Sequence, residues 1–276
     1  MKRIDFNGIT LYNENCIDVM THMKENGVGV DLTVTSPPYD QLRSYNDSST
    51  WDFEVFKKIA QGLWDVTNEG GVVVWVIGDA TINGCETGSS FRQALYFMEL
   101  GFKLWDTMIY EKNSSSFPAK RDGKRYTQIF EYMFVFVKGK MHDCHLLADK
   151  PNKWAGHTNW GKNTQYNKEG ELIQTTDIKP VPQFSLRNNI WKYSVGFNTK
   201  KFGKHPAVFP LQLAIDHILS WSLEEHTIFD PFLGSGTTMD ACIKTNRNKF
   251  IGCEIDEEYF EIIKKKVDFY KNGGSL

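Results

Sequence analysis

Short apolar runs alternate with longer amphipathic segments along most of the chain. The short runs are rich in β-branched residues, and the longer segments repeat their apolar residues with the period of a helix. Strands that alternate with helices are typical of an α/β domain with a mostly parallel sheet. The candidate strands are residues 9–13, 30–35, 71–77, 103–110, 129–137, 227–230 and 250–254. The candidate helices are residues 52–67, 89–100, 210–222, 235–245 and 257–270.

Two stretches interrupt this alternation. Only a polar, basic loop separates strand 103–110 from strand 129–137, which predicts an antiparallel pair at one edge of a seven-stranded sheet. Residues 139–204 are polar, contain scattered aromatic residues and lack clear periodicity. A loop of this length inside a compact domain indicates an insertion with its own role. We therefore expect one α/β domain, formed by residues 1–138 and 205–276, that carries an insertion at 139–204.

Composition places the chain among ordinary globular proteins, with 41% hydrophobic and 24% charged residues in 276. The longest apolar run, residues 71–78, is far shorter than the roughly 20 residues that a membrane-spanning helix needs. The N-terminus has no apolar signal segment, so we expect a cytoplasmic protein without a membrane partner. The five cysteines are scattered singly, a pattern that predicts neither a disulfide framework nor a metal site.

The net charge of −2 hides an asymmetry along the chain. Residues 112–204 contain 17 Lys or Arg against 7 Asp or Glu, whereas the rest of the chain contains 15 basic against 27 acidic residues. A basic central third on an acidic body is compatible with a surface that faces nucleic acid. A lysine-rich insertion facing only solvent has the same composition, so charge alone leaves both interpretations open.

The first motif that suggests chemistry is Ser36-Pro37-Pro38-Tyr39, which directly follows the apolar strand 30–35. Two successive prolines stiffen the chain where it leaves the carboxyl edge of the sheet, which is the edge where ligands bind in open α/β folds. The Ser36 hydroxyl and the Pro37 carbonyl are then suited to accept hydrogen bonds from one exocyclic amine. Tyr39 offers a flat face on which an extruded base can stack. A turn that ends the strand, with a core tyrosine, is the alternative.

The second motif is a strand that runs through Asp230 into a glycine turn containing Gly234 and Gly236. Glycine permits a tight turn and a close approach of backbone to ligand. A further strand ends at Glu254, a position suited to accept the hydroxyl groups of a ribose. No Gly-Lys-Ser/Thr follows the turn, and the dinucleotide pattern fails at Met239.

With both motifs in this order, the chain resembles the amino-methyltransferases of DNA in which a Pro-Pro-Tyr segment precedes the cofactor glycine loop. The segments 131–136 and 205–210 are also similar to that family. The resemblance implies a Rossmann-like methyltransferase fold and the cofactor S-adenosyl-L-methionine. It also implies that residues 1–138 form a catalytic half, residues 139–204 a target-recognition insertion, and residues 205–276 a cofactor-binding half of the same domain.

The resemblance also assigns site residues, all numbered as in this sequence. The target-base site comprises Ser36, Pro37, Pro38 and Tyr39. The cofactor pocket comprises Asp230, Phe232, Gly234, Gly236, Thr237 and Glu254, with His205 and Phe209 nearby. Asn15 stands close to the place where the family often has Gly-Asp, and we expect its amide oxygen to accept a hydrogen bond from the adenine of the cofactor. Serine at position 36, in place of Asp or Asn, favours cytosine N4 as the target over adenine N6.

Duplex DNA is the expected partner, with the target base flipped out of the stack and methylated by direct displacement. The basic loop between strands 103–110 and 129–137 is expected to contact DNA through Lys120, Arg121, Lys124 and Arg125. A disordered loop that faces only solvent is the alternative. A cognate restriction endonuclease and a homodimer are further partners that the resemblance leaves open. Two rival functions remain: an RNA or protein methyltransferase with an unusual motif order, and a catalytically silent recognition subunit that binds the cofactor. The intact Ser36-Pro37-Pro38-Tyr39 segment argues against the silent subunit.

Overall fold

The computed structural model describes residues 2–38, 51–113, 124–158, 164–174, 179–194, 202 and 210–275. The chain divides into two compact units. One unit, which we call the body, comprises Met1–His145 and Asn189–Leu276, and the other, which we call the small unit, comprises Leu146–Asn188. The small unit is shorter than the insertion expected at residues 139–204, because residues 139–145 and 189–204 belong to the body.

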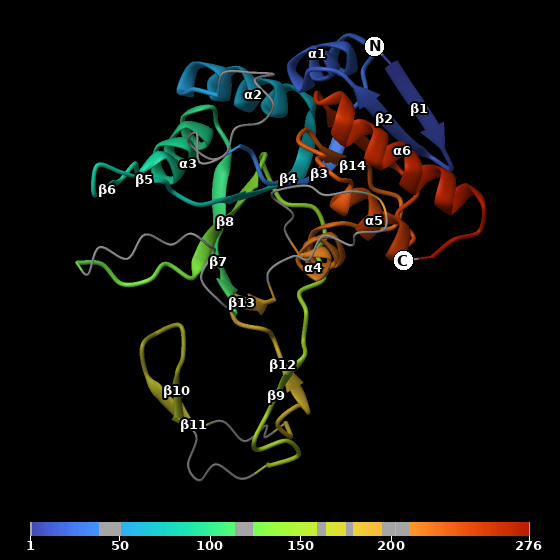
Figure 1. Cartoon of the computed structure of the whole chain (residues 1–276). Helices are drawn as coiled ribbons and strands as arrows, with labels where there is room; N and C mark the ends of the chain where they lie inside the picture. The colour runs from blue at the N-terminus through green and yellow to red at the C-terminus, as the bar shows by residue number, and fades with distance from the viewer. Residues whose placement is uncertain are drawn as a thin grey trace. The chain divides into compact units, whose positions relative to one another are not determined.

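The body is built on one large sheet, which has nine strands within the described residues, in the order β1-β2-β15-β14-β3-β4-β8-β7-β13 (Figure 1). Its strands are β1 (Lys2–Phe6), β2 (Ile9–Asn13), β3 (Val30–Thr35), β4 (Thr67–Ile77), β7 (Lys103–Lys112), β8 (Phe130–Val137), β13 (Ile190–Tyr193), β14 (Ile228–Asp230) and β15 (Phe250–Glu254). Adjacent strands from β2 to β4 are parallel. The carboxyl ends of β2, β15, β14, β3 and β4 therefore lie along one edge of the sheet.

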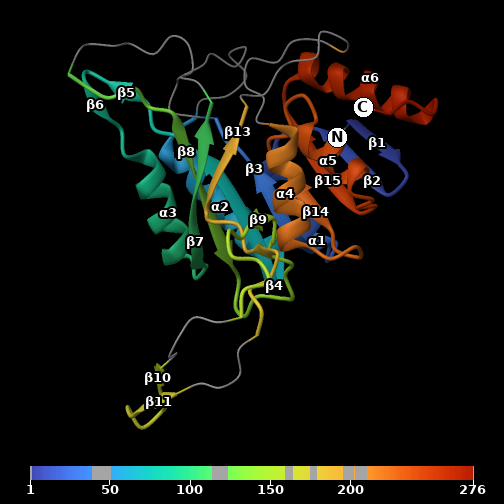
Figure 2. The same cartoon turned by 90° about the horizontal axis from the view of Figure 1, so that it is seen from below.

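Helices cover both faces of the sheet (Figures 1 and 2). They are α1 (Cys16–Glu25), α2 (Phe53–Val66), α3 (Ser89–Glu99), α4 (Leu211–Trp221), α5 (Thr237–Lys244) and α6 (Glu257–Lys271). The first three share one core, in which Phe56 of α2, Trp75 of β4 and Phe97 of α3 are all fully buried and pack edge to face. On the other face, His217 of α4 contacts the sulfur of Met133 on β8, and α4 packs against α5.

The predicted α/β class and the antiparallel pairing of strands 103–110 and 129–137 are confirmed. The sheet differs from the expectation in having nine strands rather than seven, because β1 and β13 extend its two edges. The antiparallel strand β8 lies inside the sheet rather than at its edge, because it pairs with β4 on one side and with β7 on the other. The edge beyond β7 is formed by β13, which pairs with β7 in parallel. Helix α1 was not predicted, although Val19, Met20 and Met23 form its buried face.

A short hairpin joins β4 to α3. Its strands β5 (Thr81–Ile82) and β6 (Cys85–Glu86) are connected by Asn83 and Gly84, both of which have positive φ. Two such residues are typical of a tight type I′ hairpin turn.

The small unit contains two pairs of short antiparallel strands. They are β9 (Lys150–Pro151) with β12 (Phe184–Ser185), and β10 (Thr164–Tyr166) with β11 (Leu172–Gln174). Trp154 and Tyr166 are largely exposed in this unit.

In the described part of the chain, none of the helices has the length and apolar character needed to cross a membrane.

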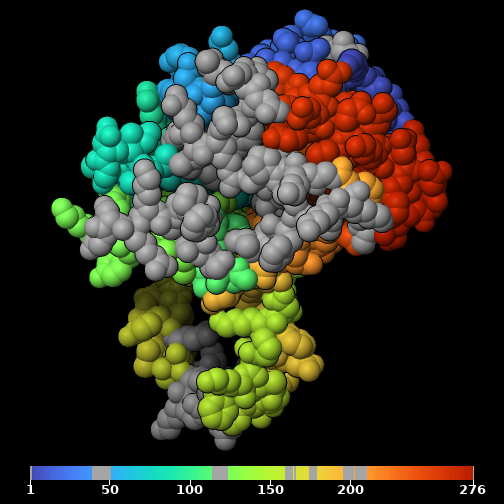
Figure 3. Space-filling model, in the orientation of Figure 1, coloured from blue at the N-terminus to red at the C-terminus, as the bar shows by residue number. Residues whose placement is uncertain are grey.

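Figure 3 shows helix α6 (red) adjoining the N-terminal strands (blue) on the surface of the body, where Lys2 of β1 forms an exposed ion pair with Glu257 of α6.

Candidate functional site

The two motifs singled out in the sequence meet at the carboxyl edge of the sheet. Strands β3 and β14 are parallel neighbours, with Leu32 opposite Ile228 and Thr33 opposite Phe229. At the ends of these strands, Thr35 Oγ1 donates a hydrogen bond of 2.6 Å to Asp230 Oδ1. The residue before Ser36 is thereby joined to the residue that opens the glycine turn, although 195 positions separate them in the sequence.

Asp230 is fully enclosed and accepts three hydrogen bonds. Besides Thr35, Thr238 Oγ1 donates to Oδ2 at 2.6 Å and the backbone N–H of Phe232 donates to Oδ1 at 3.0 Å. Burial raises the pKa of Asp230 to about 6, against the opposing effect of the two threonine hydroxyls. Asp230 thus ties together the end of β3, the glycine turn and the first turn of α5.

The glycine turn connects β14 to α5 through backbone conformations that suit glycine. Gly234 has φ of 55° and Gly236 has φ of 87°, both in the left-handed region. Gly236 is the N-cap residue of α5 and has no side chain that could accept from the first turn of the helix. The first N–H groups of a helix have no partner within the helix, so those of α5 are directed toward the turn.

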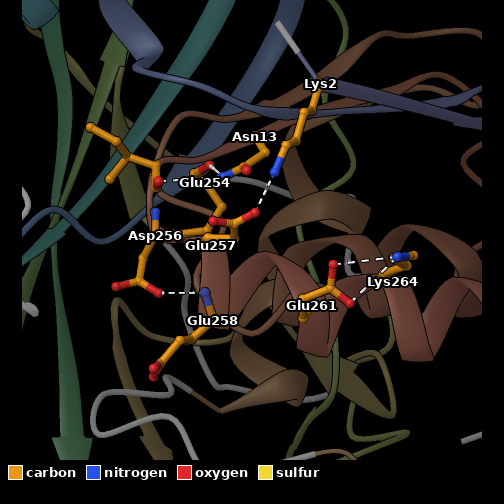
Figure 4. Close-up of polar contacts among 9 residues, drawn as sticks. Lys2, Asn13, Glu254, Asp256, Glu257, Glu258, Glu261 and Lys264 are labelled. Atoms are coloured by element: carbon orange, nitrogen blue, oxygen red, sulfur yellow. Dashed lines mark hydrogen bonds and ion pairs between the residues drawn. The ribbon is translucent and has the colours of Figure 1, made fainter.

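Glu254 ends β15 and folds back onto the glycine turn. Its Oε2 accepts from the N–H of Gly234 at 2.7 Å, and its Oε1 accepts from the N–H of Asp256 at 2.8 Å. Glu254 is only 8% exposed, and burial raises its pKa to about 7. Figure 4 shows Glu254 beside Asp256 and Asn13, whose Nδ2 donates to the Glu254 carbonyl at 2.9 Å.

Asn15 lies just beyond the end of β2, one strand away from Glu254. Its amide oxygen accepts from the N–H of Ile17 at 2.9 Å and so caps helix α1. The atom expected to contact the cofactor is therefore already engaged with the backbone, although an oxygen has a second lone pair.

The remaining predicted residues of the target-base and cofactor sites fall into two groups. Ser36 and Pro38 are half-buried and Pro37 is buried where the chain leaves β3. Tyr39, His205 and Phe209 lie outside the described residues. The structure thus brings together Ser36, Pro37 and Pro38 with the cluster of Asp230, Gly234, Gly236, Thr237 and Glu254, along adjacent strands of one edge.

Two tryptophans that were not predicted as site residues contact Phe232, which was predicted to line the cofactor pocket. The ring of Phe232 packs edge to face against Trp51, with centroids 5.7 Å apart, and against Trp75, with centroids 6.1 Å apart. Trp51 precedes helix α2 and has no local motif that marks it as a site residue. Thr35 and Thr238 were also missed as partners of Asp230, although both flank predicted motif residues.

Two of the four residues expected to bind DNA lie within the described residues. Lys124 is exposed, and Lys120 and Arg121 lie outside the described part of the chain. Arg125 is directed at the β5–β6 hairpin, where its Nη2 donates to the carbonyl of Gly84 and its Nη1 lies 3.7 Å from Glu86 Oε1. Its guanidinium therefore braces the hairpin next to the carboxyl end of β4.

The hydrogen-bonding groups at this edge of the sheet fit S-adenosylmethionine, the methyl donor implied by the resemblance. S-adenosylmethionine contains a ribose with two hydroxyl donors, for which the carboxylate of Glu254 is a suitable acceptor. The glycine turn allows the backbone to approach a ligand closely, and Asp230 holds that turn in place. The residues at this edge of the sheet therefore fit such a ligand.

Comparisons with known proteins agree with this chemistry. The N6/N4 methyltransferase family model, described as DNA methylase, matches residues 30–265. The chain is 52% identical over 255 residues to the orphan methyltransferase M.BamHII of Bacillus amyloliquefaciens, covering 90% of this chain and 93% of that protein.

Solved structures are similar over nearly the whole chain. The complex of M1.HpyAVI with SAM has a TM-score of 0.60 and 26% identity, and the match covers 94% of this chain and 99% of that one. The PvuII DNA methyltransferase, titled cytosine-N4-specific, has a TM-score of 0.63 at 17% identity, covering 98% and 94% of the two chains. At that identity the likeness to the PvuII enzyme shows the fold alone.

Proposed function

This chain belongs to the N6/N4 DNA methylase family, and within that family we propose that it methylates the N4 amine of cytosine in duplex DNA. It is a DNA methyltransferase whose methyl donor is S-adenosylmethionine. The observation that supports the proposed active site is the hydrogen bond from Thr35 to Asp230, because it places the Ser36-Pro37-Pro38 segment beside the glycine turn.

The bound donor supplies an electrophilic methyl group on a positively charged sulfur. The chain's own residues hold the nucleophile. An exocyclic amine is a poor nucleophile because its lone pair is delocalised into the ring. The Ser36 hydroxyl and the Pro37 carbonyl accept hydrogen bonds from its two N–H groups, which favours pyramidalisation of the nitrogen. The rigid segment after β3 fixes these acceptors, so much of the rate comes from positioning.

Cytosine rather than adenine is proposed from the residue at position 36. In the family that the chain resembles, serine at this position, in place of Asp or Asn, usually goes with cytosine N4 as the target. A serine hydroxyl can both accept from the amine and donate to the ring nitrogen beside it, whereas an ionised aspartate only accepts. Tyr39 provides the stacking surface for the flipped base. Cysteine thiols take no part, since direct displacement at the methyl group needs no covalent intermediate. The sulfonium would leave as a neutral thioether, and the methylated nitrogen would release one of its protons to solvent.

DNA binding is assigned to the segments that flank the small unit. The small unit itself contains 6 Lys or Arg and 4 Asp or Glu, whereas the remainder of residues 112–204 contains 11 basic and 3 acidic residues. The basic excess therefore lies mainly on the body. We propose that Lys120, Arg121, Lys124 and Arg125 contact phosphates, and that the small unit reads the sequence through side chains such as Trp154 and Tyr166.

The test uses the purified chain with labelled S-adenosylmethionine and, separately, duplex DNA, RNA and protein. Label is expected only in DNA, and digestion followed by mass spectrometry is expected to yield N4-methylcytosine. N6-methyladenine would overturn the choice of base, and label in RNA or protein would overturn the substrate. Absence of transfer with intact cofactor binding would identify a silent subunit. Sequencing that maps modified bases in cells expressing the chain gives the recognition site.

Two variants separate the two halves of the site. Ser36→Ala is expected to abolish most transfer while cofactor binding persists. Gly236→Val is expected to abolish cofactor binding, because a β-branched residue is strained at φ of 87°. Loss of cofactor binding in Ser36→Ala would contradict this division of roles.

Partners beyond DNA follow from the same proposal. A cognate restriction endonuclease is proposed only as a genetic neighbour, to be sought beside the coding sequence.

A further inference from the structure

Residues 36–50 include the proposed target-base motif, and the residues on both sides of this segment contact the glycine turn. Before the segment, Thr35 Oγ1 donates to Asp230 Oδ1 at 2.6 Å. After it, the ring of Trp51 packs edge to face against Phe232, with the centroids 5.7 Å apart and the planes at 81°. The N–H of Phe232 also donates to Asp230 Oδ1 at 3.0 Å. The two attachments therefore converge on the first residues of the glycine turn.

Trp51 is placed by the helix that follows it. Asp52 is the N-cap residue of α2, and its side chain accepts from the N–H of Val55 at 2.8 Å, which fixes the direction of the chain at this point. Helix α2 is held on the sheet by Phe56, which is fully buried and packs against Trp75. Trp51 thus stands at the junction between the proposed base-binding segment and a helix fixed by the core.

The ring of Phe232 contacts two tryptophans that differ in burial. Trp75 is fully buried, its ring centroid lies 6.1 Å from that of Phe232, and its Nε1 donates to Gln93 Oε1 at 2.9 Å. Trp51 and Phe232 are only half-buried. The contact with Trp75 therefore anchors the Phe232 ring in the core, whereas the contact with Trp51 lies at the surface of the core.

An edge-to-face aromatic contact has a strength suited to linking two binding events. Such a contact changes an equilibrium constant by roughly two- to tenfold. A cofactor that packs on the half-exposed ring of Phe232 holds that ring in one position, and the ring then holds Trp51. Less binding energy is spent on ordering Trp51 when the target base binds, so the binding of DNA becomes stronger. Because such coupling is reciprocal, bound DNA strengthens cofactor binding by the same factor.

We propose that Trp51 is a positioning residue, which couples the binding of S-adenosylmethionine to the binding of duplex DNA through its contact with Phe232. The inference rests on the proposed function, because it takes Phe232 to line the cofactor pocket and residues 36–39 to bind the target base. It does not depend on whether that base is cytosine or adenine. In this role Trp51 acts on the cofactor through Phe232 and on the base through the segment that it follows.

The test measures the affinity of the full chain for a duplex that contains its mapped site, with and without S-adenosylhomocysteine, which has no methyl group to transfer. The ratio of the two dissociation constants is the coupling factor, expected to be about five- to tenfold for the native chain. Trp51→Leu and Trp51→Met remove the ring but keep an apolar side chain, and each is expected to lower the factor to about twofold or less. Trp51→Phe retains a ring and is expected to keep most of the coupling. Cofactor affinity without DNA is expected to change by less than about threefold in every variant.

Trp64→Leu is the matched control. Trp64 is also half-buried, belongs to the last turn of α2, and packs edge to face against Phe102 with the centroids 4.9 Å apart. Its loss is expected to lower the unfolding temperature, as the loss of Trp51 does, because each variant removes one aromatic contact. The coupling factor of Trp64→Leu is expected to stay within about twofold of the native value, since Trp64 contacts neither motif of the site.

A native coupling factor near one would overturn the inference, as would a native factor in Trp51→Leu or an equal loss in Trp64→Leu. Loss of cofactor binding by Trp51→Leu in the absence of DNA would also overturn it, because Trp51 would then support the cofactor pocket itself. Each of these results leaves the proposed function intact. A native chain that binds the cofactor but not duplex DNA would overturn the proposed function, and the inference with it.

Discussion

One buried hydrogen bond, donated by the hydroxyl of Thr35, joins the two motifs of the site. It donates to Asp230 at 2.6 Å, in surroundings where burial already raises the pKa of that carboxyl to about 6. Thr33 lies two residues earlier on the same strand, is fully buried, and its hydroxyl has no partner among the described residues. The two threonines therefore form a matched pair that differs in hydrogen bonding.

Thr35→Val is expected to lower the free energy of unfolding by about 1–3 kcal/mol, since it removes a donor to a buried carboxylate. It is also expected to slow methyl transfer by roughly tenfold, because about 1.4 kcal/mol of lost positioning corresponds to that factor. Thr33→Val is expected to be neutral or stabilising, because a hydroxyl without a partner is removed from the core. Denaturant unfolding and single-turnover assays measure both effects. Equal free energies of unfolding and equal transfer rates of the two variants would refute this role for Thr35.

Glu254 links cofactor binding to pH. Its pKa of about 7 lies above the ordinary value of 4.5 because the carboxyl is buried. Between these values the folded protein retains a proton that the unfolded chain has released, so the stability of the cofactor-free protein falls as pH rises from about 4.5 to 7. Cofactor binding follows the opposite trend, since ribose hydroxyls donate to the ionised carboxylate.

Cofactor affinity is therefore expected to increase by up to about tenfold per pH unit below pH 7 and to level off above it. Calorimetric titration with S-adenosylmethionine between pH 5.5 and 8.5, in buffers of different ionisation enthalpy, measures the affinity and the proton released. Glu254→Gln is the control, and its affinity is expected to be weaker and to lose the part of the pH dependence that Glu254 causes. A constant affinity of the native protein over this range would rule out the contribution of Glu254.

At the scale of elements, a buried ion pair joins helix α6 to helix α5. Lys266 Nζ lies 2.5 Å from Asp240 Oδ2, and the Tyr270 hydroxyl donates to Asp240 Oδ1 at 2.9 Å. Both charged side chains are less than 10% exposed. Since α5 begins at the glycine turn, this contact helps to hold the turn against the sheet.

Lys266→Met is expected to destabilise the protein by about 3–5 kcal/mol, because it leaves the charge of Asp240 buried without its ionic partner. Adding Asp240→Leu is expected to recover much of that loss, since no buried charge then remains. Lys264→Met is the matched control on the same helix: its ion pair with Glu261 is half exposed, so the change is expected to stay within about 0.5 kcal/mol. Denaturant titration of the three variants is the measurement. If Lys266→Met were as stable as Lys264→Met, the ion pair would have no structural role.

At the scale of the whole molecule, the two units are expected to divide cofactor binding from sequence recognition. The body contains its own core and every contact described for Asp230 and Glu254. Replacing residues 146–188 with a short Gly-Ser linker is therefore expected to preserve folding and cofactor binding. Discrimination between DNA sequences is expected to be lost, as measured by competition binding with cognate and unrelated duplexes. Retained discrimination in this variant would assign recognition to the body instead.

Much of the architecture followed from local patterns. The strands 30–35 and 250–254 begin and end where the structure has β3 and β15, because a short, mostly apolar run bounded by polar or turn residues indicates a buried strand. Edge elements were harder to predict. Strand β1 is mostly exposed and β13 has only four residues, so neither has enough apolar residues to show a periodicity. Helix α1 was missed although Asn15 is a typical N-cap residue.

The sequence by itself determined the fold class and the two motifs, because hydrophobic periodicity, diproline stiffness and glycine conformation are properties of neighbouring residues. The tertiary structure alone decided which groups meet: Thr35 with Asp230, Glu254 with the N–H of Gly234, and Arg125 with Gly84. These pairings depend on the order of strands in the sheet. That order arises from packing between segments nearly 200 residues apart, which no local pattern encodes.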